Sequence, residues 1–386
     1  MTAKSHLLPV YKRAPYKFIR GKGSYLFDDK GKKYLDLATG IAVNSLGYNH
    51  PKVIRALQKQ AKKVWHVSNL YEIEGLEELA KELCLIAKLD YAFFTNSGAE
   101  GVECGIKMVR KYHYENGNPN KYRIIVFEDA FHGRTNATIA ASNQDKMVKG
   151  YAPLFQGFDI VKRDVNSIKE AITADTGAIL LEPIQGEGGI NIFDTEFLKA
   201  IRAICDEYGL LLFLDEVQCG VGRTGKFFAH QWAGIQPDII SVAKGIGNGF
   251  PIGACLCNQK VGLAMTTGSH GSTYGNNPLG VAVATAIIKE INREKFYQEI
   301  IKKGEYFIEQ LNLLKKQFPN QILEVKGRGL MIGIRVASDH IKLVENLRKA
   351  GLLTVPAQNS VIRILPPLNI SFKEINLAIK IIAKNL

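Results

Sequence analysis

The sequence predicts an α/β protein with two parts: a large domain with a mostly parallel sheet, and a smaller α+β domain formed by both ends of the chain. Strand and helix patterns alternate from about residue 91 to residue 243, and the strand patterns are almost continuous apolar runs. Such runs are expected where helices cover both faces of a parallel sheet. After residue 290 this alternation stops and shorter strands follow. A chain of 386 residues is long enough for more than one lobe.

The chain opens with short elements that we assign, up to residue 48, to the small domain. Two strands are predicted at Ser24–Asp29 and Lys33–Leu37. From His50 and Pro51 onward apolar residues recur with helical spacing, and a second helical pattern covers Leu76–Ala87.

The large domain is predicted to span residues 49–290. Its strands are expected at Tyr91–Thr95, Arg123–Phe127, Ala178–Glu182, Leu210–Asp215 and Ile239–Ala243, and its later helices at Glu100–Tyr114, Glu196–Tyr208 and Pro278–Asn292. Residues 291–386 are expected to form the rest of the small domain. Its helices are predicted at Lys302–Phe318, before Gly351 and after Ser371, and its strands at Ile322–Val325, Leu330–Val336, Leu352–Val355 and Val361–Leu365.

The composition is that of an ordinary folded protein, with 46% hydrophobic and 23% charged residues. The net charge of +13 raises the question of nucleic-acid binding. The basic residues are interleaved with acids and form no long arm, so we expect no nucleic-acid partner. No apolar stretch suits a signal peptide or a transmembrane helix, so we expect no membrane association. The six scattered cysteines fit reduced thiols in a cytoplasmic protein. Neither they nor the eight histidines have the spacing of a metal site.

Lys244 is the first candidate catalytic residue. It ends an apolar, β-branched run, and three glycines follow at alternate positions. Apolar neighbours favour the neutral amine that forms a Schiff base. A lysine at a strand end is more often a solvated charge, so the prediction depends on its companions. Asp215 ends another apolar run. A lysine that binds an aldehyde, with an aspartate for the ring nitrogen, is the arrangement that pyridoxal phosphate requires.

Two turns between strands and helices can complete such a site. Ser97, Gly98 and Ala99 precede a predicted helix, where exposed backbone N–H groups bind phosphates, although a simple N-cap explains the same residues. Further along, Phe131 can stack on a planar ring and Arg134 can bind a carboxylate.

Two further segments carry candidate residues. Glu187 lies in a glycine-rich loop after a predicted strand, and Arg363 of the small domain is a candidate ion-pair partner. Ser272 and Thr273 offer hydroxyl groups in a glycine-flanked turn, which by itself indicates little.

One segment imitates a nucleotide-binding loop. Gly220–Lys226 has the spacing of a P-loop, but Phe227 replaces the Ser or Thr that would bind magnesium. The acidic strand that ends at Glu216 also leads directly into this loop, whereas an ATPase places the two on neighbouring strands. We therefore exclude an NTPase.

Taken in order, these motifs resemble those of the class III, ω-amino-group aminotransferases, which have the fold-type-I architecture of pyridoxal-phosphate enzymes. The resemblance covers nearly the whole chain, from Leu8–Tyr11 through Gly40–Gly47 to Arg363–Pro367. It implies pyridoxal 5'-phosphate as the cofactor and a homodimer whose active sites are shared between subunits.

The resemblance also implies a role for each motif. Lys244 would bind the cofactor and move the reacting proton, and Asp215 would keep the ring nitrogen protonated. Around the cofactor, Phe131 and Val217 would enclose the ring, and Gln218 would approach its phenolic oxygen. Ser97, Gly98 and Ala99 would form the phosphate turn, which Thr273 of the neighbouring subunit would complete. Around the substrate, Arg134 and Ser272 would bind the acylated donor, and Glu187 and Arg363 would form a gate that opens for glutamate.

For the reaction, the resemblance implies transfer of the ω-amino group of N-acetylornithine to 2-oxoglutarate, as in arginine biosynthesis. Succinylornithine, N-succinyldiaminopimelate, ornithine and 4-aminobutyrate stay open as alternative donors, and an aminomutase as an alternative activity. Enzymes of this family that use free ornithine tend to place a tyrosine near Gly40–Ile41. Its absence here leaves apolar space suited to an acyl group, and a gate for two substrates speaks against a mutase.

The chain departs from the family pattern at three places. Asn276 replaces a usual glycine beside the phosphate site, which puts cofactor affinity in question. Tyr48 stands where a histidine is common, and the helix after Ala99 is less rich in alanine than usual.

Overall fold

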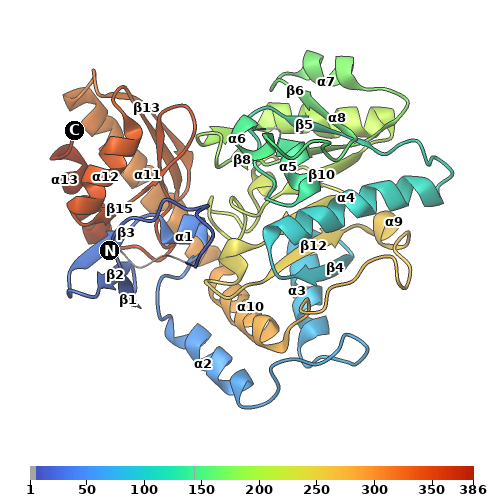
Figure 1. Cartoon of the computed structure of the whole chain (residues 1–386), viewed down its shortest axis with the longest axis horizontal. Helices are drawn as coiled ribbons and strands as arrows, with labels where there is room; N and C mark the ends of the chain where they lie inside the picture. Colours follow the sequence, from blue (N-terminus) through green and yellow to red (C-terminus); the bar gives the residue numbers. More distant parts are fainter. Residues whose placement is uncertain (1–5, 143) are drawn as a thin grey trace.

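The computed structural model describes residues 6–142 and 144–386, and a seven-stranded sheet lies at its centre (Figure 1). In spatial order its strands are β4 (Tyr91–Thr95), β12 (Gly253–Cys257), β11 (Ile239–Val242), β10 (Leu211–Asp215), β7 (Thr176–Leu181), β5 (Arg123–Phe127) and β6 (Phe158–Val161). Neighbouring strands are parallel except at β12, which is antiparallel to both β11 and β4. The prediction of a mostly parallel sheet is confirmed.

Helices cover both faces of this sheet. On one face α4 (Gly98–Glu115) packs against β10, β11 and β12, and on the other α8 (Thr195–Tyr208) packs against β7 and β10. Gly105 permits the first contact, because a Cβ atom there would lie 2.2 Å from the Phe213 ring. The strands are therefore apolar on both sides, which is why their sequences read as continuous hydrophobic runs.

The parallel strands carry their polar residues to one edge of the sheet. β4 ends at Thr95, two residues before the N-cap of α4, and β10 ends at Asp215. β11 ends at Val242, and Lys244 follows in the short 3-10 helix η2 (Lys244–Ile246). Carboxyl ends of parallel strands are the usual place for a ligand in an open α/β sheet.

The second lobe joins the two ends of the chain (Figure 1). One sheet contains β1 (Phe18–Lys22), β2 (Tyr25–Asp28), β3 (Lys33–Asp36) and β15 (Leu352–Leu353), and the other contains β13 (Ile322–Arg328), β14 (Met331–Val336), β17 (Val361–Ile364) and β16 (Val355–Pro356). β15 pairs in parallel with β3, which brings the N-terminal strands to the C-terminal lobe as expected. The domain boundaries at residues 48 and 290 stay a prediction.

Most of the remaining helices follow the expected periods. They are α2 (Pro51–Ala61), α3 (Leu76–Ala87), α10 (Pro278–Ile291), α11 (Glu294–Gln317), α12 (His340–Lys349) and α13 (Phe372–Ala383). The predicted start of α11 at Lys302 was wrong, because its buried face begins earlier, with Phe296 and Tyr297 against the core and Ile300 inside it. Several short elements were not predicted, among them α5 (Asn136–Ser142), α6 (Asp145–Val148), α7 (Val165–Ala171) and the strand β6, since segments of four to seven residues show little periodicity.

The glycine loop at residues 220–226 connects the lobes. Arg223 is only 2% exposed, and its Nη1 donates to the carbonyls of Leu330 (3.2 Å) and Pro366 (2.5 Å) in the second lobe. Burial lowers the pKa of Arg223 to about 9. The glycines that imitate a P-loop therefore belong to a structural turn.

Other features concern the described residues alone. All six cysteines are free and buried. Within residues 6–142 and 144–386, no helix is long and apolar enough to cross a membrane. The same part of the chain contains no cluster of three or more His, Cys, Asp or Glu side chains that suits a metal ion.

Candidate active site

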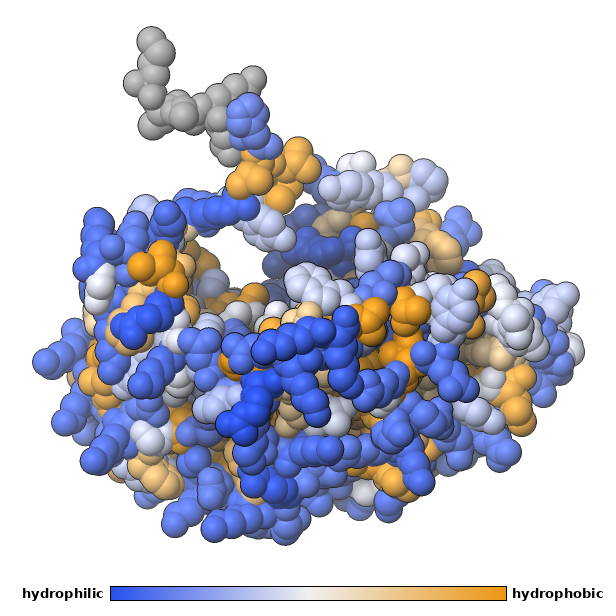
Figure 2. Space-filling model, turned by 90° about the horizontal axis from the view of Figure 1, so that it is seen from below, coloured by the Kyte–Doolittle hydropathy of each residue, from blue (hydrophilic) through white to orange (hydrophobic). Residues whose placement is uncertain are grey.

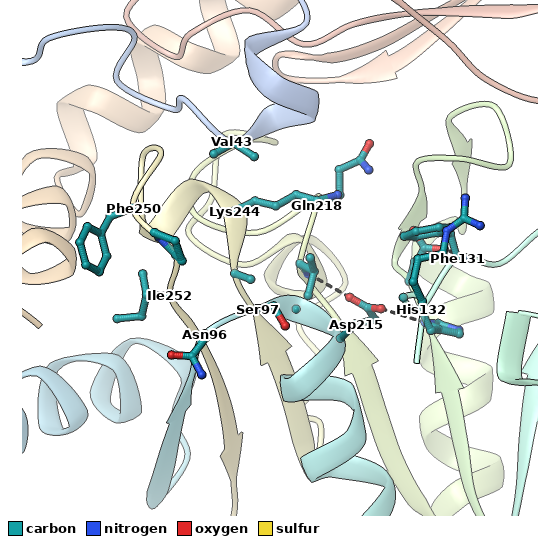
Figure 3. A pocket seen from close by; sticks show the side chains of 18 of the residues that line it. Val43, Asn96, Ser97, Phe131, His132, Asp215, Gln218, Lys244, Phe250 and Ile252 are labelled. Atoms are coloured by element: carbon teal, nitrogen blue, oxygen red, sulfur yellow. Dashed lines mark hydrogen bonds and ion pairs between the residues drawn. The ribbon is translucent and has the colours of Figure 1, made fainter. Parts of the chain in front are cut away.

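A pocket of about 350 Å³ opens at the carboxyl edge of the central sheet (Figure 3). Most of the sequence-predicted residues line it, from several elements: Ser97, Gly98, Ala99, Phe131, Arg134, Asp215, Val217, Gln218 and Lys244. The apolar side chains of Val43, Phe250 and Ile252 form part of its wall. Residues that are far apart in the sequence therefore meet around one pocket.

Lys244 lies at the centre of the pocket. Its side chain is partly accessible from the pocket and otherwise surrounded by protein. Burial is the main reason why the pKa of Lys244 is lowered, and the positive charge of Arg363 acts in the same direction. The carboxylates of Glu187, Asp215 and Glu182 oppose this shift. The sequence-based expectation of a desolvated amine agrees with this environment.

Asp215 is almost fully buried, with 3% exposure, and its two oxygens have different partners. Oδ1 accepts the backbone N–H of Val217 at 3.0 Å, while Oδ2 lies 2.8 Å from Nδ1 of His132 (Figure 3). His132 is 2% exposed, and its Nε2 has no partner within the described residues. His132 was not among the predicted site residues, because nothing in a single sequence indicates that it faces Asp215.

Glu182 is a second residue that sequence reasoning missed. Its Oε1 accepts the backbone N–H of Phe131 at 2.9 Å, and its Oε2 accepts that of Gly186 at 3.1 Å. Burial, followed by the nearby charge of Asp215, raises the pKa of Glu182 to about 7. Glu182 thus connects the backbone of Phe131, which lines the pocket, to the loop that carries Glu187.

The start of α4 forms a cradle on the floor of the pocket. Ser97 is the N-cap, and its Oγ accepts the N–H of Glu100 at 3.2 Å. A Cβ atom on Gly98 would lie 2.7 Å from Val217, so only glycine lets the helix start approach this side of the pocket. The first-turn N–H groups of a long helix favour an anion at this position.

Arg363 and Glu187 form the expected ion pair. Nη2 of Arg363 lies 2.8 Å from Oε1 of Glu187, and its Nη1 donates to Oε1 of Gln218 at 3.3 Å. Arg363 is 1% exposed, and Nη2 also donates to the carbonyl of Pro356 at 3.1 Å. β17 of the second lobe thus brings a buried guanidinium to Gln218, which lines the pocket.

Four predicted residues do not line this pocket. Glu187 and Arg363 adjoin it, because Arg363 contacts the wall residue Gln218. Thr273 and Ser272 line a separate hollow with residues 66 and 68–70. Ser272 still connects to the pocket wall, because its Oγ accepts the side-chain amide of Asn96 at 3.3 Å. Thr273 has no place in the pocket of its own chain.

Comparisons with known proteins agree with this geometry. The family model described as "Aminotransferase class-III" matches residues 9–386. The acetylornithine aminotransferase of Agrobacterium fabrum is 52% identical and aligns over 95% of this chain and 92% of its own length. Among solved structures, the N-acetylornithine aminotransferase of Stenotrophomonas maltophilia has a TM-score of 0.85 at 34% identity, covering 97% of this chain and 96% of its own. The ornithine aminotransferase of Toxoplasma gondii has a TM-score of 0.94 at 30% identity, covering 98% of this chain and 92% of its own.

We expect Glu182→Gln to change the pH dependence of stability of the apoprotein. The unfolded chain loses the Glu182 proton near pH 4.5, whereas the folded state keeps it to about pH 7. Because the folded state binds more protons in this range, its stability falls as pH rises, by roughly 1.4 kcal/mol per unit. Gln lacks this titration, so the wild type should lose stability relative to the variant up to about pH 7 and run parallel to it above. Urea unfolding of both proteins measures the difference. Parallel curves over the whole range would show that Glu182 is not held neutral.

Proposed function

Because the chain belongs to the class-III aminotransferases, we propose that it transfers the ω-amino group of N-acetylornithine to 2-oxoglutarate. The products are N-acetylglutamate semialdehyde and glutamate, as in arginine biosynthesis. The observation that carries this proposal is the Glu187–Arg363 pair next to Gln218 in the wall of the Lys244 pocket, since this pair suits two different substrates. We also propose a cytoplasmic location, on the basis of the six free, buried cysteines.

Class-III aminotransferases use pyridoxal phosphate, and this chain is a pyridoxal-phosphate-dependent transaminase. When bound, this cofactor supplies an aldehyde for the amine and a ring that accepts electrons from the reacting carbon. The pocket fits it: Lys244 offers a desolvated amine, Asp215 a buried carboxylate, and the start of α4 backbone N–H groups for a phosphate, at a place where only glycine at residue 98 avoids Val217. We assign Phe131 and Val217 to the two ring faces.

Each polar side chain of the site would act on either the cofactor or the substrate. Nζ of Lys244 would take the proton from the amino-bearing carbon and return it on the cofactor side. Gln218 would approach the phenolic oxygen and Asp215 the ring nitrogen, with His132 fixing the orientation of Asp215. Arg134, exposed at the pocket rim, would bind the α-carboxylate of the acylated donor, together with Ser272.

The Glu187–Arg363 gate would serve the two half-reactions in turn. N-acetylornithine has no carboxylate beside its reacting amine, whereas glutamate has one. A free guanidinium would lie unpaired beside the aliphatic donor, and its ion pair with Glu187 removes that penalty. When the pair opens, Arg363 can bind the α-carboxylate of glutamate.

Ornithine is the competing donor, because the ornithine aminotransferase of T. gondii has the higher TM-score although the lower identity. The overall fold therefore does not decide the donor. The wall made by Val43, Phe250 and Ile252 favours the acylated substrate, since it offers no side-chain partner for a free α-ammonium group.

We further propose a homodimer with shared sites, in which Thr273 serves the pocket of the other subunit. Thr273 faces outward beside residues 66 and 68–70. Large apolar side chains are exposed in the same region, with Leu70 at 87%, Trp65 at 64% and Tyr274 at 62%, and apolar patches lie among hydrophilic side chains on the face seen in Figure 2. Exposed apolar surface of this kind marks protein interfaces.

Asn276 holds this outward-facing segment. Its Nδ2 donates to Oδ1 of Asn69 at 3.0 Å, and Nδ2 of Asn69 donates to the Ser272 carbonyl at 2.7 Å. The φ of Asn276, 65°, lies in the left-handed region that asparagine tolerates. The departure from the family glycine is therefore compatible with the turn, and the side chain adds a link to residues 66–70.

The donor is tested by assaying the purified protein with 2-oxoglutarate against N-acetylornithine, succinylornithine, N-succinyldiaminopimelate, ornithine and 4-aminobutyrate. We expect the highest kcat/KM with N-acetylornithine, and a loss of at least about tenfold with free ornithine, because its ammonium would be desolvated unpaired. A preference for ornithine would overturn the proposed donor while leaving the transaminase assignment intact.

The gate predicts opposite effects for its two residues. Arg363→Ala should impair the glutamate half-reaction more than the N-acetylornithine half-reaction, by about 1.5–3 kcal/mol. Glu187→Ala leaves Arg363 always available, so it should speed the glutamate half-reaction relative to the N-acetylornithine half-reaction. Single-turnover absorbance changes with each substrate separately measure both effects. Equal slowing of the two half-reactions by both substitutions would rule out the gate.

Mixed dimers test the shared sites. A heterodimer of Lys244→Ala and Thr273→Ala subunits has one intact and one doubly damaged site if Thr273 crosses the interface. At limiting cofactor, an equal mixture should recover about a quarter of wild-type activity after subunit exchange. Activity that stays at the average of the two parents, with exchange verified by mass spectrometry, would refute the sharing.

A further inference from the structure

The segment that precedes Val43 has a strained backbone. Four consecutive residues of α1 (Thr39–Ala42) have positive φ, with values of 48°, 67°, 66° and 63°. Of these only Gly40 adopts such a conformation readily, and Thr39 and Ile41 are β-branched, which makes it worse. Strain of this kind persists only where surrounding contacts hold it, and it clusters at functional sites.

Asp36 holds the start of this left-handed turn. Its Oδ1 accepts the backbone N–H groups of Ala38 at 2.8 Å and Thr39 at 2.9 Å, and its Oδ2 accepts the Tyr48 hydroxyl at 2.5 Å. Asp36 is 1% exposed. Burial raises the pKa of its carboxyl, and the three hydrogen bonds act against that shift. The Tyr48 hydroxyl is therefore the side-chain donor that satisfies the second oxygen of a buried carboxylate.

Tyr48 is itself fixed by β1. A Cβ atom on Gly21 would lie 2.5 Å from the Tyr48 ring, so the glycine leaves the space that the ring occupies. The backbone of Tyr48 also exchanges hydrogen bonds with Gly23, at 2.8 and 3.0 Å. The phenol is thus held at both ends, by its backbone and by its hydroxyl.

The turn lies between the two parts of the active site. On one side Thr39 Oγ1 donates to the carbonyl of Leu365, two residues after Arg363, at 2.7 Å. On the other side Ser45 Oγ donates to the carbonyl of Gly245, next to Lys244, at 2.8 Å. Val43, which directly follows the turn, lines the pocket above Lys244 (Figure 3).

We propose that Asp36 and Tyr48 are positioning residues for the amino donor: their partly buried hydrogen bond holds the left-handed turn that places Val43 as a wall of the pocket above Lys244. The inference rests on transamination in this pocket. Neither residue lines the pocket, and both act through the turn.

The test is Tyr48→Phe, which removes one hydroxyl and keeps the ring. In the single-turnover reaction with N-acetylornithine, the half-saturating donor concentration should rise roughly fivefold while the limiting rate stays within about twofold. Cofactor affinity, measured by fluorescence quenching, should stay unchanged. Amide hydrogens at residues 38–46 should exchange faster, since the turn loses its support.

Tyr34→Phe is the matched control. Tyr34 is 1% exposed, and its hydroxyl donates to Oδ2 of Asp28 at 3.0 Å in the same N-terminal sheet. The variant therefore also loses one tyrosine–aspartate hydrogen bond, but away from the turn. It should lower stability without changing donor saturation or exchange at residues 38–46. If Tyr48→Phe behaves like this control, the proposal is wrong and Tyr48 is structural only.

Gly21→Ala provides a second variant if Tyr48→Phe does not fold. The methyl group displaces the Tyr48 ring without removing a polar atom, and it should raise the half-saturating donor concentration in the same way. The single-turnover reaction of the wild-type protein with N-acetylornithine checks the proposed function separately. If no donor reacts with the wild type, that function fails, whereas the exchange measurement still decides whether Tyr48 supports the turn.

Discussion

A lysine amine acts as nucleophile and base only after it loses its proton, and the pocket favours this by removing water from around Lys244. The surrounding protein lowers the pKa of the amine, helped by the charge of Arg363. Such desolvation would be unfavourable without compensation, so three carboxylates, Asp215, Glu182 and Glu187, stand nearby and each accepts hydrogen bonds. The protonation of Lys244 thus depends on two opposing effects: burial and Arg363 lower its pKa, and the three carboxylates raise it.

Both lobes are needed to create this balance. The central sheet contributes the ends of β4, β10 and β11, which bring the cradle, Asp215 and Lys244 to one edge. The second lobe contributes Arg363 from β17. The buried Arg223 joins the two lobes through the carbonyls of Leu330, which precedes β14, and of Pro366, which follows β17. A small shift between the lobes would change the distance from Arg363 to Glu187, and with it the charge near Lys244.

Much of this was predictable from residues alone. Continuous apolar runs that end at Asp215 and Ala243, next to Lys244, predicted the sheet, and Asp215, Lys244 and Ser97–Ala99 line one pocket at its edge. His132 and Glu182 were missed because their importance comes from partners 83 and 51 residues away. The left-handed turn at Thr39–Ala42 was hidden for a similar reason, since a single glycine in it does not reveal four positive φ angles. Thr273 cannot be understood within one chain, because its proposed partner lies in another.

The central claim is that Lys244, and no other lysine, is the amine that this pocket prepares for the cofactor. Borohydride reduction of the cofactor-loaded protein, followed by peptide mapping, tests it directly. We predict a pyridoxyl group on the peptide that contains Lys244, and none on any peptide of the Lys244→Ala variant. A label on a different lysine in the wild type would contradict this account, because the desolvated pocket would then not be where the chemistry occurs.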